Sequence, residues 1–212
     1  MIVWGALIYG TLRASKVKVI DLITEPDIEK ACDDLIALFD CENGCPFDLL
    51  IGVADGGKFI AETIARKLDL PLLIVKRQRP LTKKKSRIRN ILKYFPRKIL
   101  NFIRVIENTF YQLSLNRKHR KDKSNEIQIL SNNASLLDTL PIKNVLLIDD
   151  AVDSGATILD VEKYFQSQNW NFKVAVITQT FNKPMINADY KLYDKTLIRF
   201  PWSSDCPNEK KS

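Results

Sequence analysis

The segment at residues 145–157 constrains the fold of this chain more than any other part of it. It reads VLLIDDAVDSGAT: four apolar residues, two acids, and a small turn that carries hydroxyl groups. An unbroken apolar run indicates a strand buried on both faces, which is typical of parallel sheets. Residues 155–165 follow with helical periodicity, so the turn leads directly into a helix. The segment therefore predicts a strand, a loop and a helix N-terminus in immediate succession.

The same order of elements recurs elsewhere in the chain. Residues 47–53 form a short apolar run ending in the loop ADGG, and a helical pattern and a second apolar run follow at residues 59–68 and 70–75. Residues 172–179 supply a further strand, and residues 27–39 repeat apolar side chains at helical spacing. Repeated strand, helix and strand units predict an α/β protein with a doubly wound, mostly parallel sheet.

The turn at the end of the first segment has the composition of a phosphate-binding loop. Open α/β sheets bind ligands at the carboxyl ends of their strands, where helix N-termini present unpaired amides. A phosphate needs such amides and hydroxyl donors at close approach, and the loop supplies both through Asp153, Ser154, Gly155, Ala156 and Thr157. Asp149 and Asp150 cannot serve a phosphate, and we expect them to accept hydrogen bonds from ribose hydroxyls. The alternative is a helix N-cap without a ligand, since Ser and Asp are common caps.

A second loop with a ligand-binding composition is ADGG, at residues 54–57. Gly56 and Gly57 would let backbone amides approach a diphosphate closely, because glycine has no side chain to obstruct it. Asp55 places a carboxylate in the same loop, where it would repel a diphosphate unless Mg²⁺ intervenes or the side chain turns away. The neighbouring Lys58 is expected to offset that charge.

Residues 145–157 resemble the phosphoribosyl-pyrophosphate signature of the type I phosphoribosyltransferases, and residues 49–68 are similar to that family's diphosphate loop and helix. The resemblance implies that fold with a small hood, and transfer of ribose 5-phosphate from phosphoribosyl pyrophosphate with Mg²⁺ as cofactor. It implies that Asp149 and Asp150 are catalytic and hold the magnesium, directly or indirectly. Members of the 6-oxopurine branch, the hypoxanthine-guanine and xanthine-guanine enzymes, carry an Asp at the position of Asp153 as the proposed general base. The acceptor is accordingly expected to be a purine.

Residues 177–205 resemble the hood region of xanthine-guanine type enzymes. On that match Lys183, which precedes a proline, contacts the purine O6 atom, while Leu197 and Ile198 lie over the ring. A solvated surface lysine is the alternative for Lys183. The family often has Trp where Leu197 stands, which implies weaker purine binding or another base. The purine branch usually has Lys or Arg where Asp55 stands, which favours a second hypothesis: a catalytically weakened, nucleotide-binding regulatory or defence-system protein.

The positive charge of the chain is concentrated in one stretch. Residues 76–123 carry 17 Lys and Arg against two acids, a net +15, whereas the rest of the chain carries −7. Within this basic insert, assigned to residues 78–135, apolar side chains recur at helical spacing and predict helices. Three interpretations are open: the apolar stripe packs on the body or on a second subunit, the basic face binds nucleic acid or a nucleoprotein, or a helix lies on a membrane surface. Membrane binding has the least support.

Length and cysteine content set the remaining expectations. With 212 residues, 45% of them hydrophobic, the chain can bury one core, so residues 1–205 are assigned to a single domain and residues 206–212 to a frayed tail. Four scattered cysteines suit neither a disulfide framework nor a zinc site, which predicts reduced thiols. The apolar opening, residues 1–12, is shorter than the about 20 residues that span a bilayer. A cytoplasmic homo-oligomer is expected.

Overall fold

The computed structural model describes residues 18–39, 44–77, 126–130, 140–203 and 206. The chain divides into two compact units. The larger unit comprises Glu25–Arg79 and Lys123–Asp194, and the smaller one comprises Met1–Thr24, Pro80–Asp122 and Lys195–Ser212. The assignment of one domain stays a prediction, and the helices predicted in the basic insert lie outside the described residues. In the part of the chain that is described, no helix has both the length and the apolar character needed to cross a membrane.

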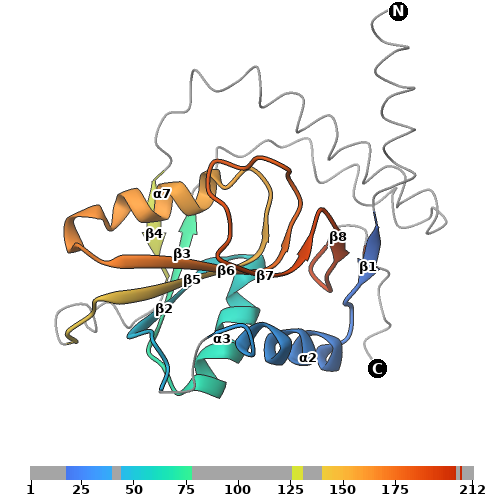
Figure 1. Ribbon diagram of the computed structural model, residues 1–212, viewed down its shortest axis with the longest axis horizontal. Helices are drawn as coiled ribbons and strands as arrows, with labels where there is room; N and C mark the ends of the chain where they lie inside the picture. Colours follow the sequence, from blue (N-terminus) through green and yellow to red (C-terminus); the bar gives the residue numbers. More distant parts are fainter. Residues whose placement is uncertain (1–17, 40–43, 78–125, 131–139, 204–205, 207–212) are drawn as a thin grey trace, which may run out of the picture. The chain divides into compact units, whose positions relative to one another are not determined.

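A six-stranded sheet forms the centre of the larger unit, in the spatial order β4-β3-β2-β5-β6-β7. All neighbouring pairs are parallel except β3 and β4. Two helices cover one face of the sheet and α7 covers the other (Figure 1). The predicted doubly wound, mostly parallel α/β fold is confirmed. The elements of this unit are α2 (Glu25–Ile36), β2 (Leu49–Ala54), α3 (Gly56–Leu68), β3 (Leu72–Arg77), β4 (Ile127–Ile129), β5 (Asn144–Val152), α7 (Ala156–Tyr164), the 3-10 helix η2 (Gln166–Gln168), β6 (Asn171–Gln179) and β7 (Tyr190–Asp194).

The core of the larger unit lies between the sheet and its helices. On the α7 side, Ile51 and Leu147 of adjacent strands belong to one apolar cluster with Val161. On the other side Gly52 leaves room for α3, since an added Cβ atom would come within 2.5 Å of the Ala61 Cβ atom. Burying a Leu, Ile or Val side chain stabilises a fold by about 1.5–3 kcal/mol. The continuous apolar runs of β2 and β5 are therefore explained by helices on both faces.

Strand β5 is longer than the sequence predicts. The apolar run that predicts it ends at Ile148, before Asp149 and Asp150, but the strand continues to Val152. The reason is that β6 stays in register with β5 up to Gln179, so the hydrogen-bond ladder continues on that side. The pairing with β2 stops at Ile148. The acid pair therefore lies where β5 remains paired with β6 but has parted from β2.

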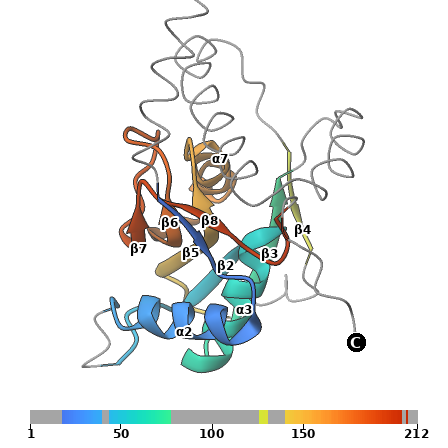
Figure 2. The same ribbon diagram turned by 90° about the vertical axis from the view of Figure 1, so that its right-hand side faces the viewer.

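The smaller unit contains a two-stranded parallel sheet of β1 (Val19–Asp21) and β8 (Leu197–Arg199) (Figure 2). The Arg199 side chain is buried and forms an ion pair with Asp21. A buried guanidinium needs such a partner, because removing the carboxylate would leave an uncompensated charge away from water. Strands of three residues show no measurable periodicity, and the sequence predicts neither of them.

Candidate functional site

The carboxyl edges of β2 and β5 are neighbours at the centre of the sheet. The chain leaves β2 through α3 toward β3, and it leaves β5 through α7 toward β6, so the two connections run in opposite directions. Adjacent strands with divergent connections form a crevice at their carboxyl ends, where open α/β sheets bind ligands. Both helices begin at this edge, and their N-termini carry a partial positive charge. The two loops predicted from the sequence therefore share one edge of the sheet.

The glycine loop, residues 54–57, contacts the acid pair of β5. A Cβ atom on Gly56 would come within 2.1 Å of the Asp150 Oδ2 atom, and one on Gly57 would come within 2.7 Å of the Asp149 Cα atom. Helix α3 begins at Gly56, earlier than the sequence predicts, because the glycines themselves form its first turn. A larger residue at Gly57 would push the loop away from the backbone of β5, whereas one at Gly56 would displace the Asp150 carboxylate. The structure thus brings these two glycines and two acids together.

The two acids are close enough to affect one another. The Asp150 N–H donates a hydrogen bond to the Asp149 Oδ1 atom at 2.9 Å. Desolvation raises the pKa of the Asp149 carboxyl well above its usual value, and the charges of Asp150 and Asp153 act in the same direction. Such a group favours hydroxyl donors or a cation and disfavours an anion. Among the described residues, no group of three or more His, Cys, Asp or Glu could hold a metal ion.

Gly155 fixes the shape of the hydroxyl-bearing loop, residues 153–157. Its φ angle is 76°, in the left-handed region that glycine adopts without strain. A Cβ atom here would come within 2.7 Å of the Ile186 backbone nitrogen. The Met185 N–H donates a hydrogen bond to the Ser154 carbonyl oxygen at 2.7 Å. The segment after β6 therefore lies directly against this loop and leaves no room for a side chain at Gly155.

Helix α7 begins directly after a glycine, and a helix cap without a ligand stays the alternative role of this loop. The N-cap residue of α7 is Gly155, which has no side chain that could cap the helix. The Ser154 Oγ atom accepts a bond from the Ala156 N–H at a long 3.4 Å. In a well-capped helix a side-chain oxygen satisfies the first free amides. The N-terminus of α7 is therefore suited to an external anion.

Asp153 is held by a residue that the sequence analysis missed. The Thr180 hydroxyl donates a hydrogen bond to the Asp153 Oδ1 atom, and the Thr180 N–H donates another to the Val152 carbonyl oxygen at 2.9 Å. Thr180 is only 7% exposed, so these bonds form largely away from bulk water. It directly follows β6 and orients the Asp153 carboxylate at the end of β5. Its sequence signal is weak, because Thr is common in and beside strands.

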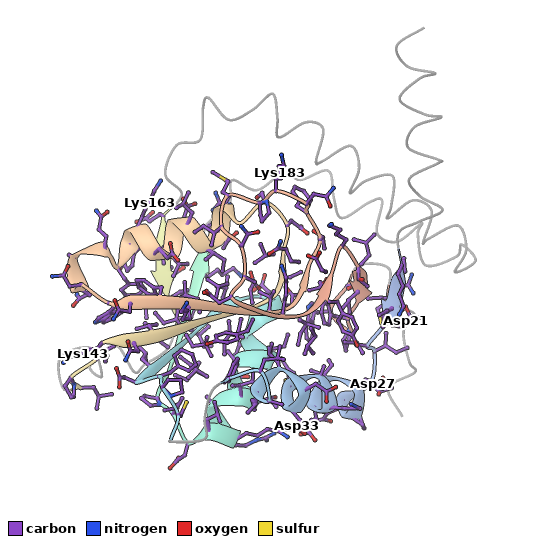
Figure 3. The ribbon with its side chains drawn as sticks, viewed as in Figure 1. Asp21, Asp27, Asp33, Lys143, Lys163 and Lys183 are labelled. Carbon is purple, nitrogen blue, oxygen red and sulfur yellow. The ribbon has the colours of Figure 1, made fainter. Side chains whose placement is uncertain are left out.

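Residues 180–188 form a closed loop that carries Lys183. The buried Gln179 joins its ends: Gln179 Oε1 accepts from the Ala188 N–H at 3.0 Å, and Gln179 Nε2 donates to Asn187 Oδ1 at 3.2 Å. Lys183 is exposed, and its side chain points away from the sheet (Figure 3). The loop therefore borders the hydroxyl-bearing loop, while the Lys183 ammonium faces solvent. Contact of Lys183 with a purine stays a prediction.

Asp55 has a partner at the glycine loop. The Ala54–Asp55 peptide bond is cis, and the Asp55 carboxylate accepts a 2.7 Å hydrogen bond from the Lys76 Nζ atom of β3. Lys58, which the sequence suggested for this role, instead lies 3.7 Å from Glu62, one turn further along α3. Residues four apart on a helix face each other, which explains that preference. The cation that offsets Asp55 therefore comes from β3.

Leu197 and Ile198 belong to the smaller unit. They lie in β8, where both side chains are buried. Their predicted place over a purine ring stays a prediction. All the other predicted site residues lie in the larger unit, in β5 or in the loops and helices that follow β2, β5 and β6.

No family model matches the chain, and no curated protein matches it. Solved structures do match. A purine phosphoribosyltransferase from Pyrococcus horikoshii has a TM-score of 0.53 at 19% identity, covering 92% of this chain and 100% of that one. A hypothetical protein from Neisseria gonorrhoeae with bound ppGpp has a TM-score of 0.55 at 16% identity, covering 88% and 90%. A xanthine-guanine-hypoxanthine phosphoribosyltransferase from Helicobacter pylori has a TM-score of 0.52 at 16% identity, covering 87% and 92%.

Proposed function

Since this chain has the type I phosphoribosyltransferase fold, we propose that it transfers ribose 5-phosphate from phosphoribosyl pyrophosphate to a purine base, with Mg²⁺ as cofactor. The observation that carries the proposal is the contact between the glycine loop and the acid pair, where a Cβ atom on Gly56 would lie 2.1 Å from Asp150. This contact joins a loop suited to a diphosphate with carboxylates suited to a ribose. A 5′-phosphate at residues 153–157 completes the ligand.

Each part of the ligand has its own set of groups at this edge of the sheet. The 5′-phosphate accepts hydrogen bonds from the amides at the N-terminus of α7 and from the hydroxyls of Ser154 and Thr157. The ribose hydroxyls donate to Asp149 and Asp150. The diphosphate lies against the N-terminus of α3, where glycines permit a close approach of the backbone. The three sets follow the order of the three groups in phosphoribosyl pyrophosphate.

The reaction requires positioning more than a nucleophilic side chain. The bond between the ribose C1 atom and the diphosphate oxygen breaks, and its electron pair leaves with the diphosphate. A ring nitrogen of the purine forms the new bond to C1, and the Asp153 carboxylate accepts the proton that the purine loses. The hydrogen bond from Thr180 orients Asp153 for this role. Holding both reactants in line contributes a large part of the rate.

The acid pair fits the proposed magnesium. Mg²⁺ prefers oxygen ligands and is commonly held by one or two carboxylates together with phosphate oxygens of the substrate. Asp149 and Asp150 are adjacent carboxylates at the crevice, so they would hold the ion, directly or indirectly, with ligand oxygens supplying the rest. When bound, Mg²⁺ offsets the negative charge that develops on the leaving diphosphate.

Diphosphate release with a panel of bases tests the proposal. The protein is incubated with phosphoribosyl pyrophosphate, Mg²⁺ and hypoxanthine, guanine, xanthine or adenine in turn. We expect release with a 6-oxopurine, and a loss of about 100-fold or more when Asp153→Asn removes the proton acceptor. Lys173→Gln, a change at the opposite end of β6, serves as the control and should retain activity. Absence of release with every base, although phosphoribosyl pyrophosphate binds, would contradict the proposed enzyme.

A second candidate is a nucleotide-binding regulatory or defence-system protein. Asp55 favours it, since a carboxylate at the glycine loop opposes a diphosphate, and so does the likeness to a Neisseria gonorrhoeae protein whose structure contains bound ppGpp. In this candidate the basic insert docks nucleic acid or a nucleoprotein. Retention of nucleic acid should then fall steeply with salt, because each phosphate contact releases a counterion. If the protein retains no nucleic acid at low salt, nucleic acid is not its partner, and a subunit interface becomes the favoured role of the insert.

A further inference from the structure

We propose that Lys76 is the cation that binds the diphosphate group, and that Asp55 competes with the ligand for it. The inference rests on the proposed function, because it requires a diphosphate at the glycine loop. It assigns a ligand-binding role to a residue of β3 and a regulating role to the acid beside it.

The register of the sheet places Lys76 beside the glycine loop. Ala54 lies opposite Lys76 in the parallel pair of β2 and β3, so the next residue, Asp55, leaves its strand next to the lysine. The Lys76 Nζ atom lies 2.7 Å from the Asp55 Oδ1 atom. Asp55 is also the N-cap residue of α3, yet its side chain makes no cap hydrogen bond. The carboxylate is thus turned toward the ammonium group of β3.

The Asp55–Lys76 ion pair adds little to the stability of the fold. The Lys76 side chain is 42% exposed and the Asp55 side chain is 81% exposed, and ion pairs exposed to this degree contribute little. An Asp at an N-cap would ordinarily stabilise its own helix through the first amides. The pair therefore has its main effect on charge: it holds an ammonium group at the loop and neutralises the acid there.

Among the cations described near the glycine loop, Lys76 is the one held beside Asp55. Lys58 lies near Glu62 along α3, and the Arg77 Nε atom lies 2.7 Å from Asp160 Oδ2 of α7, with both side chains largely buried. Lysine carries its charge on a flexible stem, so the ammonium group can leave a carboxylate for a more strongly charged anion. Binding of the diphosphate must then break the pair with Asp55. Asp55 consequently weakens the affinity for the ligand.

Equilibrium binding of two separate probes, inorganic pyrophosphate and ribose 5-phosphate, tests the inference. We expect Lys76→Gln to weaken pyrophosphate binding about tenfold, which is the loss expected for one charged hydrogen bond, and Lys76→Arg to retain most of it. Asp55→Asn should strengthen pyrophosphate binding about threefold or more. All three variants should bind ribose 5-phosphate within about twofold of the wild type.

Two matched variants control for the loss of charge. Lys173→Gln removes a lysine that forms a similar 2.8 Å ion pair with Asp189 near the amino end of β6. Asp33→Asn removes an exposed acid of α2 that lies 2.5 Å from Lys67. Neither should alter the affinity for pyrophosphate. Thermal unfolding of all variants establishes that any loss of binding occurs in folded protein.

The outcomes separate this inference from the proposed function. Unchanged pyrophosphate affinity in Lys76→Gln, or weaker affinity in Asp55→Asn, would overturn the inference even if ribose 5-phosphate binds normally. Asp55→Asn should strengthen pyrophosphate binding less in protein that also carries Lys76→Gln. A gain in affinity of the same size there would show that Asp55 does not act by competing for Lys76. If the wild type does not bind ribose 5-phosphate, the proposed function is wrong. If neither the wild type nor Asp55→Asn binds pyrophosphate detectably, the inference is wrong.

Discussion

The N-termini of α7 and α3 lie at the same edge of one sheet but are built differently. The loop before α7 is shaped by backbone contacts: Gly155 is in the left-handed region and packs against the backbone of Ile186. The loop before α3 contains the acid Asp55, whose charge is balanced by Lys76 from the adjacent strand. The first loop is therefore sensitive mainly to shape and the second mainly to charge. Substitutions that alter only one of these properties should separate the two loops.

The largest effect is expected from Gly155→Val. A β-branched residue is strained at a φ of 76°, and its Cβ atom would lie 2.7 Å from the Ile186 nitrogen. We expect the affinity for phosphoribosyl pyrophosphate and for a purine nucleoside 5′-monophosphate to fall about 100-fold or more, or about 2.8 kcal/mol, in calorimetry. Gly44→Val is the control, because Gly44 has a φ of 102° but open space within 4 Å. It should lose stability through strain and keep its affinity. Unchanged affinity in Gly155→Val would mean that the site is assigned to the wrong loop.

The two glycines of α3 should respond differently to the same substitution. In Gly57→Ala the new Cβ atom meets the backbone of β5, which cannot move without disturbing the sheet, so we expect a loss of about 2–3 kcal/mol in the free energy of unfolding. In Gly56→Ala it meets the Asp150 carboxylate, which can rotate, so we expect about 1 kcal/mol together with weaker ribose 5-phosphate binding. Urea unfolding measures the first property and calorimetry the second. Equal losses of stability, with normal ligand affinity in Gly56→Ala, would contradict this difference in packing.

A smaller effect is expected from removing the hydroxyl that orients Asp153. Thr180→Val keeps the side-chain shape and removes the donor, so we expect kcat to fall about tenfold with little change in the KM for phosphoribosyl pyrophosphate. Thr180→Ser restores the hydroxyl and should recover most of the rate. A purely structural role for Thr180 would instead lower the stability of Thr180→Val without a selective loss in kcat. Recovery in Thr180→Ser is the outcome that separates the two roles.

The smallest effect is expected from Lys183, because its ammonium group is exposed and screened by solvent. We expect Lys183→Met to reduce the preference for hypoxanthine over adenine about threefold to tenfold, since the ammonium can donate to the O6 atom and not to an amino group. Lys163→Met, at an exposed position of α7, is the control and should leave the preference unchanged. If wild-type protein prefers adenine or does not distinguish the two bases, the assignment to a 6-oxopurine fails while the fold stands.

The sequence predicts the centre of the sheet and the two loops, because these features are encoded locally. β2 and β5 are continuous apolar runs, and Gly56 and Gly155 directly precede or begin helices. The edge strand β7 is missed because all its side chains are at least partly exposed and give no apolar run. Lys76 and Thr180 are missed for another reason. Each contacts its partner, Asp55 or Asp153, only because two strands pair in a particular register. A contact set by register is not visible in the local pattern of one strand.

If the two loops hold the two ends of one ligand, a competition measurement can show it. Binding of ribose 5-phosphate and of inorganic pyrophosphate is measured by calorimetry, each alone, each in the presence of the other, and each in the presence of phosphoribosyl pyrophosphate. Two adjacent subsites predict that the two small ligands bind together, while phosphoribosyl pyrophosphate displaces both with an affinity higher than either. Mutual exclusion of ribose 5-phosphate and pyrophosphate, or displacement of only one of them by phosphoribosyl pyrophosphate, would contradict a single site built from both loops.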